Sequence, residues 1–267
     1  MRSKFPPKKS DNELSRSKNL LGNKFENILT WINSEDGQLL SNMIKSLGSF
    51  VIGDPTGIII PYVFDLSNSN LRRRFLKDFN DLTNRLNENK EKIDGSFLKS
   101  EIGQEILKET IHQLINQNDE EKRKSHIQFL VNAYTKEKAR TDRISVFMNI
   151  LILLEPSALQ ILHVISNPEE TVTKIMEKHD HTRLTNQINL KNDVRRLLTI
   201  DSEIFERAIT KLESEQIIAR NGLEIAWCSG EYHKEQKNEA KIRMTEALKR
   251  LVTQFGKDFT SYFTNTK

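Results

Sequence analysis

Residues 201–227 read DSEIFERAITKLESEQIIARNGLEIAW, and this stretch decides the fold that we expect for the C-terminal part of the chain. Asp201 or Ser202 is the expected N-cap of a helix over 201–215, because short polar side chains accept backbone N–H groups at a helix start. The apolar residues of this helix recur at helical spacing and form its expected inward stripe: Ile204, Phe205, Ala208, Ile209 and Leu212.

A short β-hairpin is expected directly after that helix. The segments QIIAR (216–220) and LEIAW (223–227) flank Asn221 and Gly222. A type I′ turn favours the Asn-Gly dipeptide, because both of its central residues need a positive φ. A helix followed at once by a hairpin is the outline of a winged-helix module.

Two earlier helices complete this module. The segment PSALQILHVI (156–165) is the expected first helix, with proline at a position where its missing N–H costs nothing. The segment EETVTKIMEKH (169–179) is the expected second helix, and residues 180–200 then form an unusually long insert before the third. We therefore expect a winged-helix-like module over 155–267.

The spacing of apolar residues near the end of the sequence predicts one C-terminal helix with an apolar stripe. The stripe covers the module or pairs with a second copy, because an apolar patch of that size is rarely left in water. We expect a homodimer whose interface includes Leu248, Leu251, Phe255 and Phe259. The full stripe consists of Leu248, Leu251, Val252, Phe255, Phe259 and Phe263.

Residues 23–154 are expected to form a helical domain. Apolar residues recur at helical spacing over 70–93, 96–117 and 120–134, and Asn118 or Asp119 is a candidate N-cap. The segment 144–154 is apolar almost all round, which suits the central helix of a bundle. With only 10 glycines and 6 prolines, we predict a mainly α fold, an N-terminal helical bundle followed by a winged-helix-like module with one short β-hairpin.

The net charge of +4 does not belong to the expected folded part. Residues 1–20 carry six basic and two acidic side chains, so they account for all of it. We expect 1–22 to be a disordered basic tail. The alternative is a weak contact of this tail with phosphate or an acidic membrane surface.

Cysteine content and the absence of a secretory signal pattern favour the cytoplasm, and a composition rich in Asn, Lys and Ile favours a prokaryote. A lone cysteine, Cys228, excludes an internal disulfide framework, and no secretory signal pattern opens the sequence. The apolar stretch 47–64 is interrupted by glycines and prolines, so we interpret it as a buried turn; a membrane-inserting hairpin is the alternative.

A search for an active site finds no catalytic motif, so we expect a non-enzymatic protein without a cofactor. His179 to His181, reading HDH, are the one place where two histidines and a carboxylate are neighbours in sequence. No third ligand lies at useful spacing, so we favour a solvated loop over a metal site. His126 is interpreted as a partly buried core histidine.

The helix over 201–215 is acidic, which disfavours DNA, because a helix in the major groove lies between phosphates. Arg195, Arg196 and Arg220 could still reach a nucleic-acid backbone. We expect an interaction or regulatory protein that works through protein contacts; a winged-helix DNA-binding regulator is the alternative. The charged residues of the helix are Asp201, Glu203, Glu206, Glu213 and Glu215 against Arg207 and Lys211.

A resemblance to other proteins rests on two segments, DEEKRKSHIQFLVNA (119–133) and FMNILILLEPSALQILHVISNPEE (147–170). In outline, residues 70–260 resemble uncharacterised prokaryotic helical proteins with a C-terminal helix-turn-helix-like or winged-helix-like part. Some of those proteins are encoded among phage-defence genes. The resemblance implies an association with defence and assigns no functional residue.

Overall fold

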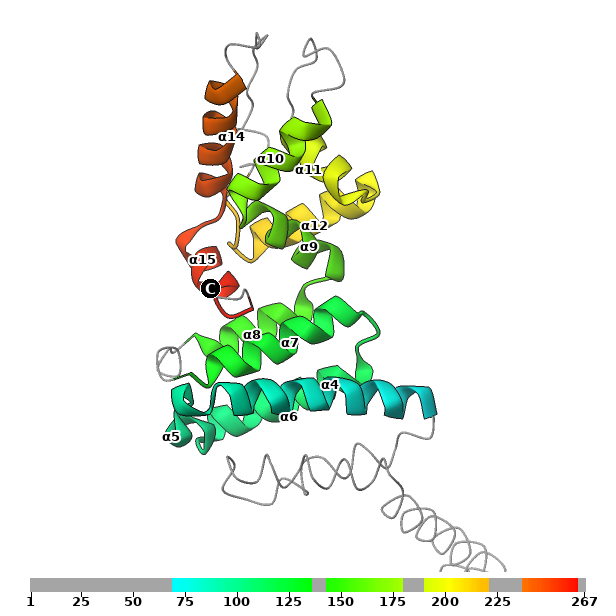
Figure 1. Ribbon diagram of the computed structural model, residues 1–267, viewed down its shortest axis with the longest axis vertical. Helices are drawn as coiled ribbons and strands as arrows, with labels where there is room; N and C mark the ends of the chain where they lie inside the picture. Colours follow the sequence, from blue (N-terminus) through cyan, green and yellow to red (C-terminus); the bar gives the residue numbers. More distant parts are fainter. Residues whose placement is uncertain (1–68, 136–142, 180–189, 221–236, 264–267) are drawn as a thin grey trace, which may run out of the picture. The chain divides into compact units, whose positions relative to one another are not determined.

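The structure of the protein is a computed structural model (Figure 1), which describes residues 69–135, 143–179, 190–220 and 237–263. The chain separates into two compact units, Met1–Asn84 and Arg85–Lys267. The second unit contains helices from both of the regions that the sequence assigned to separate domains. The tail 1–22, the stretch 47–64 and Cys228 lie outside the described residues.

The described part of the chain is mainly α, as predicted, and contains no strand. Its helices are α4 (Ser69–Glu88), the 3-10 helix η1 (Lys90–Lys92), α5 (Gly95–Leu98), α6 (Glu101–Asn116), α7 (Glu120–Ala133), α8 (Ile144–Leu153), α9 (Pro156–Ile165), α10 (Pro168–His179), α11 (Leu190–Leu198), α12 (Ser202–Ser214), α14 (Lys237–Leu251) and α15 (Gln254–Thr260). Two isolated antiparallel bridges join Ile93 to Thr135 and Ile218 to Val252.

Local capping sets several of the helix starts. Asp119 caps α7, its carboxylate accepting the backbone N–H of Lys122 at 2.7 Å. The Ser100 hydroxyl caps α6 by accepting the N–H of Gly103 at 3.1 Å. This cap divides the single helix expected over 96–117 into α5 and α6, because the chain turns at Lys99 and Ser100 before the second helix begins.

Helices α6, α7 and α8 pack against one another and form the bundle part of the second unit. Its core is aliphatic and aromatic, and Tyr134 is completely enclosed in it. The Tyr134 hydroxyl donates a hydrogen bond of 2.6 Å to the Gly103 carbonyl. Burial raises the pKa of this phenol, so the hydroxyl stays protonated and holds the end of α7 against α6.

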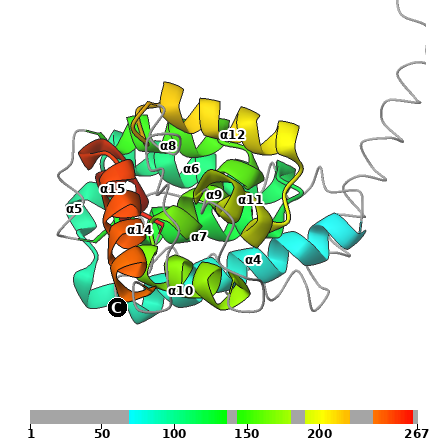
Figure 2. The same cartoon turned by 90° about the horizontal axis from the view of Figure 1, so that it is seen from above.

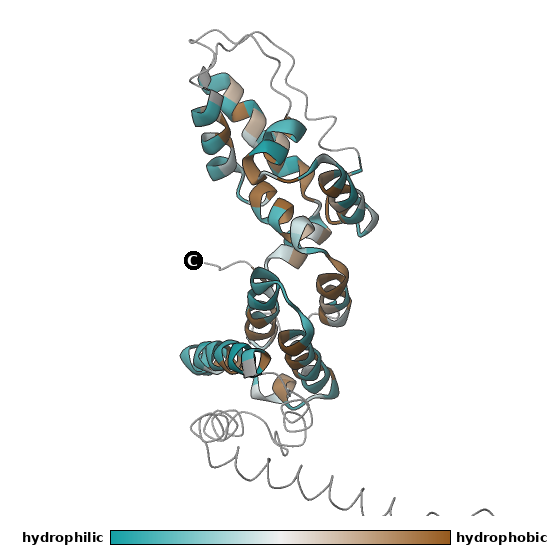
Figure 3. Ribbon diagram, turned by 90° about the vertical axis from the view of Figure 1, so that its right-hand side faces the viewer, coloured by the Kyte–Doolittle hydropathy of each residue, from teal (hydrophilic) through white to brown (hydrophobic). Residues whose placement is uncertain are grey.

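The second half of the unit is arranged around α9. Figure 2 shows α9 near the centre of the view, with α10, α11, α12 and α14 around it, and each of these four helices contacts α9. In Figure 3 the hydrophobic residues, in brown, gather mainly on the helix sides that face other helices. The bounds predicted for the first helix, 156–165, agree with α9, and those of the second and third agree with α10 and α12 within a residue.

The prediction of an insert over residues 180–200 is wrong for the second half of that segment. Residues Leu190–Leu198 form α11, and only Thr199 to Asp201 separate this helix from α12. The chain reverses there through Thr199, which has a positive φ of 55°. The helix directly before α12 in the chain is therefore α11 and not α10.

The prediction of a single, continuous C-terminal helix is also wrong. The chain leaves the helical path at Val252 and Thr253, because these residues pair with the segment after α12. Thr253 then starts a new helix, its hydroxyl accepting the N–H of Gly256 at 2.9 Å. The predicted apolar stripe is consequently divided between α14 and α15.

No single helix among the described residues is both long enough and apolar enough to cross a membrane. Helices α8 and α9 meet the length and composition criteria only when they are taken together, and they are bent by 117° relative to each other.

Candidate protein-contact surface

A short turn, Thr199 to Asp201, joins helices α11 and α12. The Asp201 carboxylate caps α12 by accepting the N–H of Glu203 at 2.8 Å, as the sequence predicted. Arg195 on α11 donates a hydrogen bond of 2.6 Å to the Ser202 hydroxyl. Lys191 on α11 forms an ion pair of 2.8 Å with Glu206. These contacts fix the start of α12 against α11.

The outward face of α12 begins with Ile204, an apolar residue that the sequence predicted to face the core. Phe205, Ala208, Ile209 and Leu212 are buried as predicted, but the Ile204 side chain is 40% exposed. Its neighbours Ser202 and Glu203 are exposed as well, so the first turn of the helix is uncovered. The Ile204 side chain therefore lies among exposed polar residues at the start of α12 and not in the core.

The two basic residues of α12 are both held by carboxylates of the chain. The Arg207 guanidinium donates to Glu155 at 2.9 Å and 3.3 Å. The Lys211 ammonium lies 2.7 Å from the Glu215 carboxylate. Each such ion pair between exposed groups contributes only about 0–1 kcal/mol to stability. Because the helix has more carboxylates than cations, it keeps an excess of negative charge.

The three arginines predicted as nucleic-acid contacts lie on two segments. Arg195 and Arg196 are in the last turn of α11, and Arg220 lies beyond α12 with an exposed side chain. Arg196 is exposed, and its nearest guanidinium nitrogen is 4.0 Å from the Asp193 carboxylate. The second half of the predicted hairpin, after Arg220, lies outside the described residues.

The residues predicted as a homodimer interface are mostly covered by their own chain. Leu248, Leu251 and Phe259 are buried, whereas Phe255 is half-buried. The ring of Phe147 on α8 lies 5.2 Å from the Phe255 ring and 5.6 Å from the Phe259 ring. The α15 part of the stripe therefore packs on α8, and α14 contacts α10 and α9. The homodimer itself stays a prediction.

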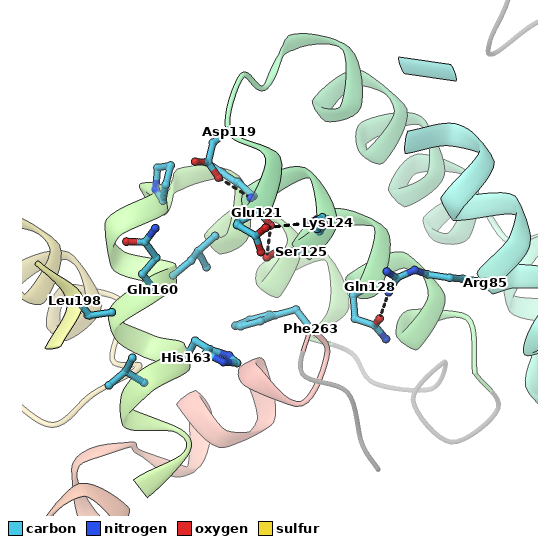
Figure 4. Close-up of a pocket in the computed structure, with 14 residues that line it drawn as sticks. Arg85, Asp119, Glu121, Lys124, Ser125, Gln128, Gln160, His163, Leu198 and Phe263 are labelled. Carbon is cyan, nitrogen blue, oxygen red and sulfur yellow. Dashed lines mark hydrogen bonds and ion pairs between the residues drawn. The ribbon is translucent and has the colours of Figure 1, made fainter. Parts of the chain in front are cut away.

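A cavity of about 370 Å³ opens between α7 and α9. Figure 4 shows Ser125 and Gln128 from α7 on one side, and Gln160 and His163 from α9 on the other. The ring of Phe263 lies between the two sides, and Leu198 at the end of α11 also contributes. Lining residues come from α4, α7, α9, α11 and the C-terminal segment, and no pattern in the sequence predicted their meeting.

The charged residues on the α7 side of this cavity are already engaged. Arg85 donates to the Gln128 side-chain oxygen at 2.6 Å, and Lys124 lies 2.9 Å from Glu121. Lys122 is buried and donates to the Ile152 carbonyl at 2.8 Å. Burial lowers the pKa of Lys122, and the nearby carboxylates Asp119 and Glu155 oppose that effect.

His126 lies one turn after Lys122 on α7 and is completely buried, more deeply than the sequence predicted. Neither ring nitrogen has a hydrogen-bond partner in the part of the chain that the structure describes. Burial lowers the pKa of His126 to about 3, and the positive charge of Lys122 adds to the effect. The imidazole is therefore neutral and belongs to the core.

Among the described residues, no three His, Cys, Asp or Glu side chains lie close enough together to hold a metal ion. Of the HDH sequence, His179 is the last residue of α10, and residues 180 and 181 lie outside the described residues.

Comparisons of the chain with protein-family models, with curated proteins and with solved structures found no match.

Proposed function

We propose that the protein is a non-enzymatic interaction or regulatory protein that makes protein contacts through the outward face of α12. The observation that carries the proposal is the charge of this helix. Its carboxylates outnumber its cations by three when both caps are included, and both cations are held within the chain.

The same charge opposes insertion of α12 into DNA. A recognition helix in the major groove lies between two rows of phosphates. Arg207 would have to leave Glu155 to reach a phosphate, and Glu155 would then face the nucleic acid without its partner, beside the exposed carboxylate of Glu203. A basic or apolar protein surface meets no such repulsion.

A winged-helix DNA-binding regulator is the second candidate, and the tight α11–α12 connection favours it. In this function Arg195, Arg196 and Arg220 would contact the backbone, and residues 216–227 would form the wing. The proposed assignment to a prokaryotic cytoplasm and to a defence context rests on the sequence composition and resemblance.

Mobility shifts on genomic fragments across a salt series separate the two functions. We expect any retardation to be weak and to disappear when residues 1–20 are deleted, because the tail carries the excess positive charge. Retardation that survives this deletion and falls steeply with salt would establish DNA binding instead. A variant with Arg195, Arg196 and Arg220 changed to Ala then tests whether the helix-turn-helix is responsible.

Protein contact is tested in the cell with a photo-crosslinking amino acid at position 203. We expect crosslinked products there, and none with the same group at position 242, which is exposed on α14. Equal crosslinking at the two positions, or none at either, would argue against a specific contact on α12.

A further inference from the structure

The cavity of about 370 Å³ between α7 and α9 has the size of a small-molecule site. Ligand pockets in proteins span about 300–1,000 Å³, so this cavity lies near the lower end of their range. A ring system with one sugar-sized substituent fits such a volume, whereas a peptide helix does not. The described residues that line the cavity belong to elements other than α12, so the cavity is separate from the contact surface of the proposed function.

The polar side chains on the α7 side of the cavity are engaged within the chain. The Ser125 hydroxyl donates to the Glu121 carbonyl at 2.9 Å, and the Gln128 side-chain oxygen accepts from Arg85 at 2.6 Å. The Glu121 carboxylate lies 2.9 Å from the Lys124 ammonium. A charged ligand would have to compete for these groups, so the α7 side favours an uncharged ligand.

The α9 side presents two polar side chains that are not engaged in this way. Gln160 and His163 both line the cavity (Figure 4), and because they lie three residues apart they share one side of α9. Neither side chain forms a hydrogen bond or an ion pair with a residue that the structure describes. The Gln160 amide offers donors and an acceptor, and a neutral His163 imidazole offers one of each. The α9 side can therefore hydrogen-bond the polar edge of a ligand.

An aromatic ring and aliphatic side chains complete the lining. The Phe263 ring lies between the two sides of the cavity (Figure 4) and is half-buried. It makes an edge-to-face contact with the Phe259 ring, with 4.9 Å between the ring centres. Leu159 and Leu198 also line the cavity. Planar bases commonly bind proteins by stacking on an aromatic side chain of this kind.

We propose that this cavity binds a free purine nucleoside, with its base against Phe263 and its polar edge at Gln160 and His163. A purine is planar and uncharged, as the two sides of the cavity require. The N6 and N7 atoms of adenine form a donor and acceptor pair that a glutamine amide matches. A hydrocarbon ring would displace water from Gln160 and His163 without replacing its hydrogen bonds, so it fits less well.

Isothermal titration of the full chain with adenosine tests the proposal, and we expect a dissociation constant below about 1 mM. Gln160→Leu and His163→Phe nearly keep the side-chain size and remove the hydrogen bonds, so each should weaken binding about fivefold. Phe263→Leu removes the stacking surface and should weaken binding about tenfold. The matched control is Gln254→Leu, an exposed position on α15 outside the cavity, which should keep the wild-type affinity. Unchanged helical circular-dichroism spectra verify that the variants fold.

Equal affinity of the wild type and the three cavity variants would overturn the proposal, as would the absence of binding by both adenosine and guanosine. A single-stranded oligonucleotide of about 12 nucleotides distinguishes a free nucleoside from a nucleic-acid strand. We expect no competition with adenosine. Competition that Phe263→Leu abolishes would assign the cavity to a base of a strand and overturn the free-nucleoside assignment. Crosslinking at position 203 does not depend on any of these results, so the proposed function and this inference fail separately.

Discussion

The backbone N–H of Ala219 donates a hydrogen bond of 2.8 Å to the carbonyl of Leu251. The Thr253 N–H returns a bond of 3.1 Å to the Ile217 carbonyl, so the segment that leaves α12 and the break between α14 and α15 form a short antiparallel contact. This contact ends α14, directs α15 toward α8 and places Phe255 and Phe259 against Phe147.

Gly256 is the residue that allows this close approach. A Cβ atom at position 256 would lie 2.1 Å from the Ile217 carbonyl oxygen, a backbone atom that cannot move away alone. We expect Gly256→Ala to lower the free energy of unfolding by about 1–3 kcal/mol in spite of the better helix propensity of alanine. Urea denaturation measures the change. Gly95→Ala is the control, since a Cβ there meets nothing within 4 Å; equal effects at both positions would contradict the steric argument.

The sequence predicted those features that neighbouring residues decide. The bounds of α9, α10 and α12, the caps Asp119 and Asp201 and the position of Pro156 follow from periodicity and side-chain hydrogen bonding within a turn. Helix α11 was also predictable from local periodicity, because Leu190, Val194 and Leu198 recur at steps of four.

The features that the sequence could not predict depend on distant residues. The break after α14 arises from pairing with Ile217 and Ala219, which leaves no local signal. Periodicity also identifies the apolar side of a helix without saying how far its neighbour extends. The exposure of Ile204, Val146 and Leu153 is for this reason visible only in the structure.

His126 predicts a loss of stability in mild acid. Its pKa is about 3 in the folded protein against an ordinary value of 6.5. Between these values the unfolded chain binds a proton that the folded chain does not, so stability decreases as pH falls. The slope is about 1.4 kcal/mol per pH unit below 6.5.

We expect His126→Leu to remove this dependence. Urea midpoints at pH 7 and at about pH 5.5, above the ordinary carboxylate range, should differ for the wild type and agree for the variant. A variant that loses as much stability as the wild type over this interval would show that other groups cause the acid sensitivity.

Phe259 tests whether the C-terminal apolar stripe packs within the chain. Its ring is fully buried, 4.9 Å from the Phe263 ring and 5.6 Å from that of Phe147. We expect Phe259→Ala to lower the unfolding free energy by about 3–5 kcal/mol without changing the mass measured by light scattering. Ile242→Ala, on the exposed side of α14, should change stability by no more than about 0.5 kcal/mol. A halved mass with intact stability would instead place these residues in a homodimer interface.

A substitution at Thr199 tests the turn that joins α11 and α12. Its φ of 55° lies in the left-handed region, which β-branched side chains rarely adopt because the Cβ substituents crowd the backbone. Glycine removes that strain, which stabilises the folded state by about 1 kcal/mol. The greater conformational entropy of glycine in the unfolded chain offsets part of this stabilisation. We expect Thr199→Gly to raise the unfolding free energy by about 0.5–1 kcal/mol, with a higher urea midpoint and an unchanged slope.

Gln216, at φ 59° after α12, is the matched control. Because glutamine is unbranched at Cβ, Gln216→Gly should gain less than Thr199→Gly. Destabilisation by Thr199→Gly would mean that the threonine side chain itself supports the turn.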